Sequence, residues 1–141
     1  MAAFVWTSKL ETGVVAIDDQ HKRLFEAIND LGQAFRYGDI AAQIEQSMAF
    51  LLNFTLEHFL EEEAWMRTIE YPEIEAHQAE HAKLVASLLA LRDRSNAGEH
   101  MTRRVTQYLV HWLGQHIEEF DMDYIKHAQA RKLGYQTETV N

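Results

Sequence analysis

The sequence predicts an all-α protein, an up-down-up-down four-helix bundle with an N-terminal arm and a short C-terminal tail. Apolar residues recur at helical spacing in four long segments, which is the pattern of amphipathic helices. The 141 residues include a single proline and six glycines, too few for the many turns of a sandwich or barrel. Short connections between long helices favour antiparallel neighbours. A chain of this length can bury one continuous core, so we expect residues 1–141 to form one domain.

The first two helices are expected in the N-terminal half of the chain. The first runs from about Asp18 to Tyr37, with Asp18 as a plausible N-cap and Gly38 as a plausible stop. The second begins after Asp39 and carries its inward face as far as Ile69.

The other two helices follow a turn at Tyr71-Pro72. The residue before a proline is pushed out of the helical region, and proline suits a first helical turn, so a third helix begins there and carries apolar residues to Leu91. A loop is expected around residues 95–98, and a fourth helix carries its stripe from Val105 to Phe120. From about Tyr124 to Asn141 no stripe of comparable quality is visible, which indicates a short helical tail or a frayed end.

Composition excludes several classes of function. Cysteine is absent, so thiolate zinc sites, iron–sulfur clusters and disulfides are ruled out, and any metal must be held by nitrogen and oxygen. The net charge of −9 without a basic stripe argues against nucleic acid and anionic membrane surfaces. The N-terminus does not have the pattern of a signal peptide, and no apolar run is long enough to span a bilayer. We therefore expect a soluble, cytoplasmic protein.

Polar residues occupy positions where the core of a bundle would normally hold leucine. They are His21, His58, Glu62, His77, His81 and His116. A single core histidine usually only bonds a backbone carbonyl, but five of them on four helices, accompanied by acids, strain that explanation. A buried ionised carboxylate is costly unless it is paired or bound to a metal. The set therefore favours a metal site.

The spacing of these residues predicts that they meet. His58 and Glu62, like His77 and His81, are four residues apart, so each pair points the same way from one helix. In an up-down-up-down bundle the beginnings of the first and third helices lie at the same end as the ends of the second and fourth. All six residues lie near those helix ends, so they converge on one layer.

Asp121 is a seventh candidate whose position is harder to explain. It follows His116 by five residues, which is about 140° around an ideal helix, so the two would not share a face. A local widening into a π-type turn, which is common at functional sites, would bring them together.

The ligand types suit two ions better than one but leave the metal open. Five imidazoles and two carboxylates are too many for one ion, and imidazole binds zinc, copper, iron and nickel. The Glu-x-x-His pair of ferritin-like proteins and the His-Glu-x-x-His of zinc peptidases are both missing from the sequence, which disfavours those families.

Four motifs follow one another at helical spacing. They are Trp6 through Gly13-Val14 to Ile17-Asp18-x-Gln20-His21, His58-Phe59-x-x-Glu62-Glu63-x-x-Met66, Tyr71-Pro72 with His77-x-x-x-His81, and Trp112-Leu113-x-x-His116-Ile117-x-x-x-Asp121. Together they resemble the hemerythrin family, particularly its single-domain bacterial members, over roughly residues 4–125. Leu84 departs from the pattern, because members often carry an aromatic residue there.

The resemblance implies a centre of two iron ions joined by an oxo or hydroxo group. One iron would be bound by His77, His81 and His116, the other by His21 and His58, and both by the bridging carboxylates of Glu62 and Asp121. The iron with two histidines keeps an open position, where the family binds dioxygen reversibly.

Apolar neighbours of the candidate ligands predict an oxygen pocket. They are Phe25, Phe59, Trp112, Leu113 and Ile117. No further acid or histidine is expected to point inward, so a dry pocket without a proton donor would slow breakage of the O–O bond.

Other polar residues near the motifs are expected to take no part in the site. Glu61 and Glu63 are expected to face water, since they flank Glu62 at about 100°. His100, His111 and His127 are expected to bind nothing.

Three classes of function remain open at this stage. The leading hypothesis is a monomeric oxygen-binding protein, not an enzyme, for storage, delivery or sensing, with a possible transient protein partner that receives the oxygen. The alternative is a di-iron enzyme or stress protein that acts on peroxide or nitric oxide, or that releases iron for repair. A sensory module would normally need a fused output domain.

Overall fold

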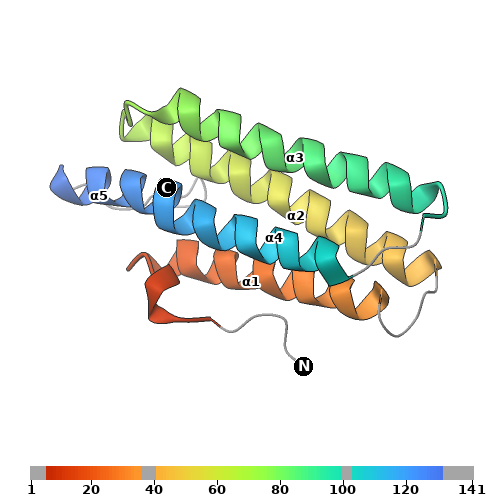
Figure 1. Cartoon of the computed structure of the whole chain (residues 1–141). Coiled ribbons are helices and arrows are strands. Elements are labelled where there is room, and N and C mark those ends of the chain that lie inside the picture. The colour runs from red at the N-terminus through yellow and green to blue at the C-terminus, as the bar shows by residue number, and fades with distance from the viewer. Residues whose placement is uncertain (1–5, 36–40, 100–102, 132–141) are drawn as a thin grey trace.

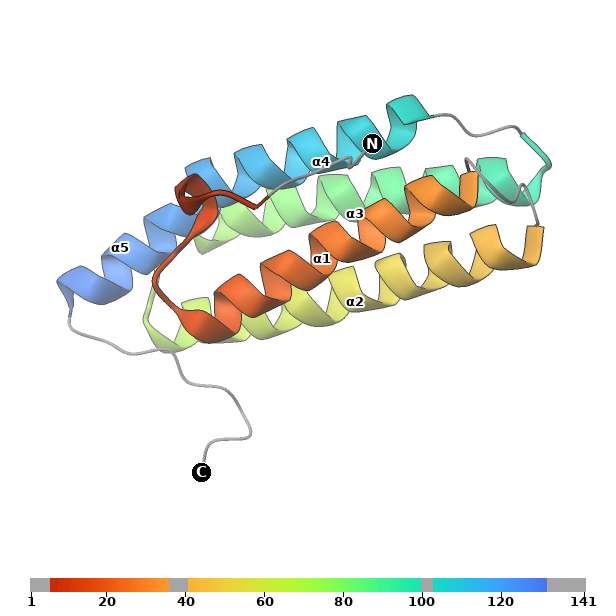
Figure 2. The same ribbon diagram turned by 90° about the horizontal axis from the view of Figure 1, so that it is seen from below.

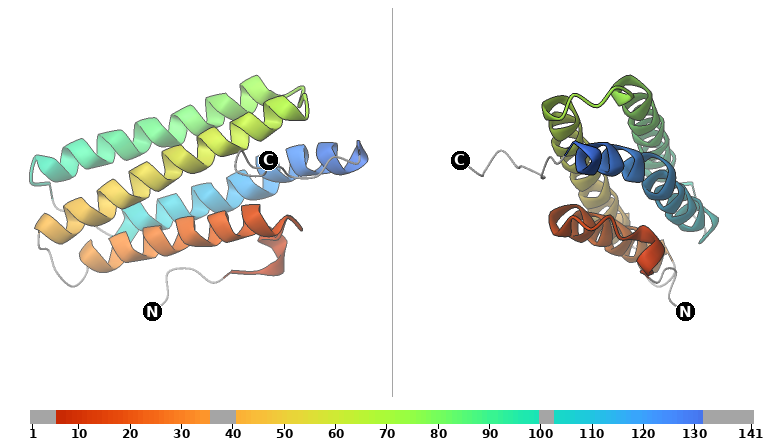
Figure 3. Two further views of the ribbon diagram at one scale, coloured as in Figure 1. Left: turned by 180° about the vertical axis from the view of Figure 1, so that it is seen from behind. Right: turned by 90° about the vertical axis from the view of Figure 1, so that its left-hand side faces the viewer.

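Four antiparallel helices make up most of the molecule. The computed structural model describes residues 6–35, 41–99 and 103–131. The helices are α1 (Val15–Gln33), α2 (Ala41–Thr68), α3 (Ile74–Asn96) and α4 (Arg103–His116), and they run up and down in turn (Figure 1). The end-on view in Figure 3 shows them arranged around a common interior. The predicted all-α bundle is confirmed.

The N-terminal arm is fastened to the first turn of α1. It contains a 3₁₀ turn, η1 (Ser8–Leu10), whose Leu10 is buried. Helix α1 begins at Val15, earlier than predicted, so Asp18 lies inside its first turn and is not its N-cap. The Asp18 carboxylate instead accepts hydrogen bonds from the backbone N–H and the hydroxyl of Thr12, at 2.8 and 2.9 Å. The predicted end at Tyr37 and Gly38, and the start after Asp39, lie outside the described residues.

The turn between α2 and α3 is where the sequence predicted it. Helix α2 ends at Thr68, Glu70 adopts a left-handed φ of 55°, and α3 begins at Ile74, just after Pro72. At its other end α3 continues to Asn96, which is two residues into the predicted loop. Gly98 follows with a φ of +87°, a conformation that suits glycine.

The segment after α4 forms a short helical tail, one of the two alternatives that the sequence left open. Residues Ile117–Asp121 form a π-helical turn, η3, and the chain then continues as α5 (Met122–Ala130) in the direction of α4 (Figure 2). Helix α5 is a packed element, because Tyr124, Ile125 and Ala128 are buried. Its neighbours in this second apolar cluster include Trp65, Met66, Ile69 and Tyr71. Three inward residues are too short a stripe for periodicity to detect.

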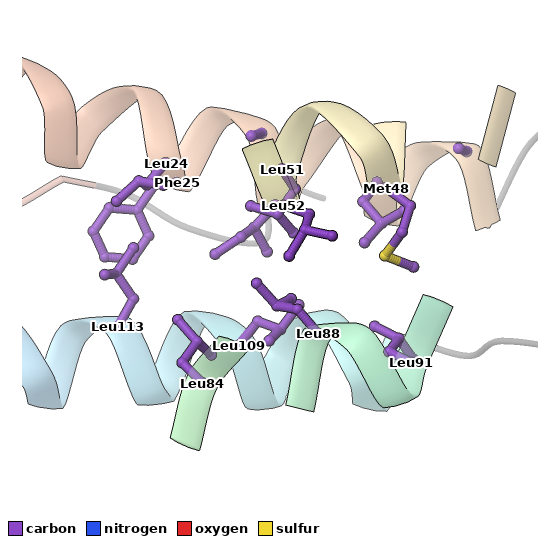
Figure 4. Packing of buried hydrophobic residues seen from close by; sticks show 14 of the residues in the cluster. Leu24, Phe25, Met48, Leu51, Leu52, Leu84, Leu88, Leu91, Leu109 and Leu113 are labelled. Carbon is purple, nitrogen blue, oxygen red and sulfur yellow. The ribbon is translucent and has the colours of Figure 1, made fainter. Parts of the chain in front are cut away.

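Leucine side chains from all four helices fill the main core. In Figure 4, Leu84, Leu88 and Leu91 of α3 face the side chains of α2, and Leu113 of α4 lies below Phe25 of α1. None of the helices in the described ranges is long and apolar enough to cross a bilayer.

Removal of a core leucine should destabilise the bundle, whereas removal of a surface leucine should not. Leu31 of α1 has no exposed surface, and Leu60 of α2 is 65% exposed. We expect Leu31→Ala to lower the free energy of unfolding by about 2–5 kcal/mol through lost burial and the cavity that remains. Leu60→Ala should change it by less than about 0.5 kcal/mol. Chemical denaturation of both variants, at one metal content, measures the difference. Equal effects would contradict the packing described.

Candidate metal centre

The structure brings all seven candidate side chains together in one layer of the bundle. They are His21 of α1, His58 and Glu62 of α2, His77 and His81 of α3, His116 at the end of α4 and Asp121 at the end of η3. None of them is more than 3% exposed. The layer lies at the end of the bundle that holds the turn between α2 and α3.

The seven side chains form two groups that share both carboxylates. The larger group contains Glu62, His77, His81, His116 and Asp121, and the smaller contains His21, His58, Glu62 and Asp121. In each group, one nitrogen or oxygen atom of every member lies within 4.8 Å of the others. This division into three and two histidines is the one that the family resemblance implied.

Glu62 presents one oxygen to each group. Its Oε1 lies 3.0 Å from Nε2 of His81 and 3.4 Å from Nε2 of His77. Its Oε2 lies 3.4 Å from Nε2 of His58 and 3.8 Å from Nε2 of His21. A carboxylate with this placement can bridge two metal ions.

Asp121 has the same arrangement on the other side of the site. Its Oδ1 lies 3.0 Å from Nε2 of His77 and 3.2 Å from Nε2 of His116. Its Oδ2 lies 3.0 Å from Nε2 of His21. Two carboxylates therefore lie between the two sets of imidazoles.

The π-helical turn explains how Asp121 reaches the site. Residues five apart diverge by about 140° on an α-helix, but a turn with i→i+5 hydrogen bonds brings them onto one face. The turn begins immediately after His116 and ends at Asp121. The widening that the sequence required of this segment is present.

The carboxylates change the protonation of the nearby histidines in the metal-free protein. Burial alone would lower the pKa of His21, but Asp121 and Glu62 outweigh it and raise this pKa to about 9. The same balance raises the pKa of His77 to about 9. Burial alone would also raise the pKa values of the two carboxyl groups, yet the neighbouring histidines hold both well below their usual range. Protons on imidazoles thus compensate the buried negative charge.

The site fits metal ions better than it fits protons alone. Among the described residues, seven buried polar atoms of the candidate ligands have no hydrogen-bond partner. Three are the Nδ1 atoms of His21, His77 and His116, and the other four are Nε2 of His21, Oε1 of Glu62 and both carboxylate oxygens of Asp121. The Nε2 atoms of His77 and His81 lie 3.1 and 3.2 Å from that of His116. Two nitrogen ligands about 2.1 Å from one ion, and at a right angle, lie about 3 Å apart. The nitrogens are therefore spaced like ligands of a single ion.

Glu63 does not face water, so that expectation is wrong. Its Oε2 accepts a hydrogen bond from Nδ1–H of His81 at 2.7 Å, and its side chain is 15% exposed. The flank of α2 that carries Glu63 packs against α3, which helix periodicity alone does not reveal. Glu61 on the opposite flank also has a partner, because Nε2 of Gln20 donates to it at 3.3 Å.

Tyr124 lies in direct contact with the candidate ligands, although no pattern in the sequence singled it out. Its hydroxyl donates a hydrogen bond to Oε2 of Glu62 at 2.7 Å, and its ring packs edge-on against Trp65. A phenol therefore donates a hydrogen bond to a candidate ligand, and the expectation that named only acids and histidines did not cover it. Its position three residues after Asp121, on the same helical face, was the available signal.

The residues predicted to form an oxygen pocket surround the ligands. Phe59 stacks on His81 with 3.6 Å between ring centroids, and Trp112 stacks on His116 at 4.7 Å. The other three predicted residues, Phe25, Leu113 and Ile117, are buried. Their contact with oxygen stays a prediction.

A small cavity lies one helical turn from the ligand layer. Its volume is about 10 Å³, and its lining includes Leu24, Thr55, Leu84 and Leu113. Each of these residues is three positions from a candidate ligand histidine, one on each of the four helices. Apart from Thr55 the lining is formed by leucine and isoleucine, so it is almost wholly apolar.

Two of the histidines that were expected to bind nothing, His111 and His127, are described and lie outside both groups. His111 is exposed on α4. Nε2 of His127 lies 3.2 Å from the backbone carbonyl of Ile69, so His127 has a structural partner at the end of α2. His100 lies outside the described residues.

Comparison with known proteins identifies the family. A family model described as "Hemerythrin HHE cation binding domain" matches residues 12–128. The chain belongs to the hemerythrin family. A bacteriohemerythrin of Pseudomonas aeruginosa is 36% identical over 125 residues, covering 89% of this chain and 81% of the relative. One from Methylococcus capsulatus is 33% identical over 126 residues, covering 88% and 95%.

The fold of a solved hemerythrin is also shared. A crystal structure of wild-type hemerythrin superposes with a TM-score of 0.81 at 32% sequence identity, covering 87% of this chain and 95% of that one. The resemblance stated from the motifs is confirmed. The assignment of individual residues as ligands stays a prediction.

Metal binding to the metal-free protein should release protons. At pH 7, below the raised pKa values of about 9, His21 and His77 are protonated. A metal ion needs neutral imidazole, so each must lose its proton on binding. Calorimetric titration with zinc at pH 7, in buffers of different ionisation enthalpy, counts the protons released. Release of about two per chain is expected, with affinity rising as the pH rises towards 9. No release would contradict the protonation described.

Proposed function

We propose that this chain binds dioxygen reversibly at a pair of iron ions, for oxygen storage, delivery or sensing. The observation that carries the proposal is the unequal division of histidines around two shared carboxylates. The metal beside His21 and His58 would have one imidazole fewer than its neighbour, which leaves a position for an external ligand. The family model and the bacteriohemerythrin names of the relatives support this proposal.

The chain's own side chains would hold the two irons as the resemblance implies. His77, His81 and His116 would hold one iron, His21 and His58 the other, and Glu62 and Asp121 both. Iron in this site would supply electrons that dioxygen accepts on binding and returns on release. The side chains would fix the positions of the two ions, so the spacing between the ions would follow from how the helices pack.

Exclusion of water supports reversible binding. The cavity beside the ligand layer, at about 10 Å³, is at the lower limit of the volume that holds one water molecule. A water there would need two to four polar partners, and the lining offers the hydroxyl of Thr55. Leu24, Leu84 and Leu113 therefore keep the space next to the ligands apolar.

Among the described residues, Tyr124 is the phenol that contacts the candidate ligands, and its hydroxyl proton is already used in a hydrogen bond. The Tyr124 hydroxyl donates to Oε2 of Glu62, so its proton is held at a carboxylate oxygen on the two-histidine side. No residue lining the described cavity is ionisable, so none can supply a proton from that side. These features favour oxygen binding over the alternative, an enzyme or stress protein that acts on peroxide or nitric oxide or releases iron.

We also propose that residues 1–141 act as one domain and as a monomer that passes oxygen to a transient protein partner. In the described part of the chain, the exposed large apolar side chains are Val15 on α1, Phe50, Leu56 and Leu60 on α2, and Tyr108 on α4. Leu56 and Leu60 lie one turn apart, and small exposed apolar groups of this kind are normal for a monomer.

Oxygenation cycles test the proposed function. The purified protein is reduced without air, its iron is assayed, and the visible spectrum is followed as oxygen is admitted and removed. About two irons per chain and an absorption band that appears and disappears with oxygen are expected. A single zinc ion, or oxidation that deoxygenation does not reverse, would refute the proposal.

Two histidine variants provide the matched control for this experiment. His58→Ala should lose most of the iron of the two-histidine group and the oxygen-dependent band with it. His111→Ala, an exposed position on α4, should keep the iron content and the band unchanged. Equal losses in both variants would mean that the ligand assignment is wrong.

A further inference from the structure

The Nδ1 atoms of the five histidines differ in their hydrogen-bond partners. All five Nε2 atoms face the two carboxylates, so the Nδ1 atoms point away from them. Within the described part of the chain, Nδ1 has a side-chain partner in one histidine of each group. Nδ1 of His58 lies 2.6 Å from Oε1 of Gln20, and Nδ1 of His81 lies 2.7 Å from Oε2 of Glu63. One histidine thus faces a neutral amide, and the other a carboxylate.

Further hydrogen bonds determine which atoms of Gln20 and Glu63 face the two histidines. Glu61 accepts a hydrogen bond from Nε2 of Gln20 at 3.3 Å, which leaves the amide oxygen facing His58. Gln78 donates to Oε1 of Glu63 at 3.2 Å, which leaves Oε2 facing His81. Both histidines therefore donate from Nδ1, and their Nε2 atoms remain free to bind metal.

Each partner also connects two helices. Gln20 precedes His21 on α1 and reaches His58 on α2, whereas Glu63 follows Glu62 on α2 and reaches His81 on α3. Every ring held this way therefore has its orientation set from a neighbouring helix. The ring of His81 is also stacked on Phe59, so it is fixed on two sides.

We propose, on the basis of the proposed di-iron function, that Glu63 and Gln20 are positioning residues whose unequal charge makes the metal of the three-histidine group the more easily oxidised. A carboxylate that accepts a hydrogen bond from a metal-bound imidazole raises the basicity of that ligand more than a neutral amide does. A more basic ligand stabilises the more positive metal ion. The metal remote from the open position then gives up its electron more readily when oxygen binds at the other.

Removal of the Glu63 charge tests the proposal. Glu63→Gln keeps an acceptor for His81 but makes it neutral, like Gln20. In an anaerobic redox titration of the iron-loaded full chain, we expect the oxidised-to-reduced ratio at a fixed potential to fall about tenfold. For a one-electron step this is a positive shift of about 59 mV. Glu57→Gln is the matched control, since Glu57 is an exposed acid on α2 beside His58, and it should cause no shift.

A double variant that exchanges a carboxylate and an amide should shift the midpoint potential in the opposite direction, and it leaves the net charge unchanged. The double variant Gln20→Glu with Glu61→Gln moves the carboxylate onto His58 and leaves an amide to donate to it. The midpoint should move negative, because both held imidazoles then have an anionic partner. A Glu63→Gln midpoint equal to that of Glu57→Gln, or a positive shift in the double variant, would overturn the proposal.

Zinc binding gives a readout that needs neither iron nor oxygen. Glu63→Gln should weaken one of two zinc-binding steps of the metal-free protein about tenfold, whereas Glu57→Gln should weaken neither. Unchanged zinc affinities in Glu63→Gln would overturn the proposal. Both experiments exclude oxygen, so their results do not depend on reversible oxygen binding. Failure of the wild-type protein to bind oxygen reversibly would refute the proposed function, whereas the positioning proposal would still be tested by the shifts in potential and in zinc affinity.

Discussion

Two carboxylates with no exposed surface, Glu62 and Asp121, are the constraint on which the rest of the structure depends. Removal of an ionised group from water costs several kcal/mol even after relaxation, so each needs compensating positive charge. Imidazoles from all four helices surround the pair, and in the metal-free protein His21 and His77 supply this charge as protons, with pKa values of about 9. Two metal ions can supply it more completely. The bundle topology and the site therefore depend on one another, since no pair of helices alone holds the whole set.

The layers around this pair follow one another at helical spacing. The five buried histidines come first, and one turn away Leu24, Thr55, Leu84 and Leu113 line the cavity between them and the rest of the core. Polar partners outside the ligands come from residues directly beside them in sequence, such as Gln20 and Glu63. A histidine on one helix is thereby oriented from the next, so the positions of the ring nitrogens depend on how the helices pack.

The sequence predicted what depends on periodicity and could not predict what depends on packing. The bundle and the convergence of six polar residues followed from stripes on ideal helices. Asp121 did not, because the π-helical turn that brings it to His116 departs from the ideal helix. Tyr124 was missed because the inward stripe of α5 contains only three residues. Glu63 was expected to face solvent because no pattern within α2 records that α3 covers this flank of the helix.

Anomalous diffraction at the iron edge, from crystals of the iron-loaded protein, tests the central claim most directly. The account predicts two peaks per chain, one about 2.1 Å from Nε2 of His77, His81 and His116 and the other equally close to His21 and His58. An oxygen of Glu62 and an oxygen of Asp121 should bind at each peak. A single peak, or two peaks that do not share these carboxylates, would contradict it.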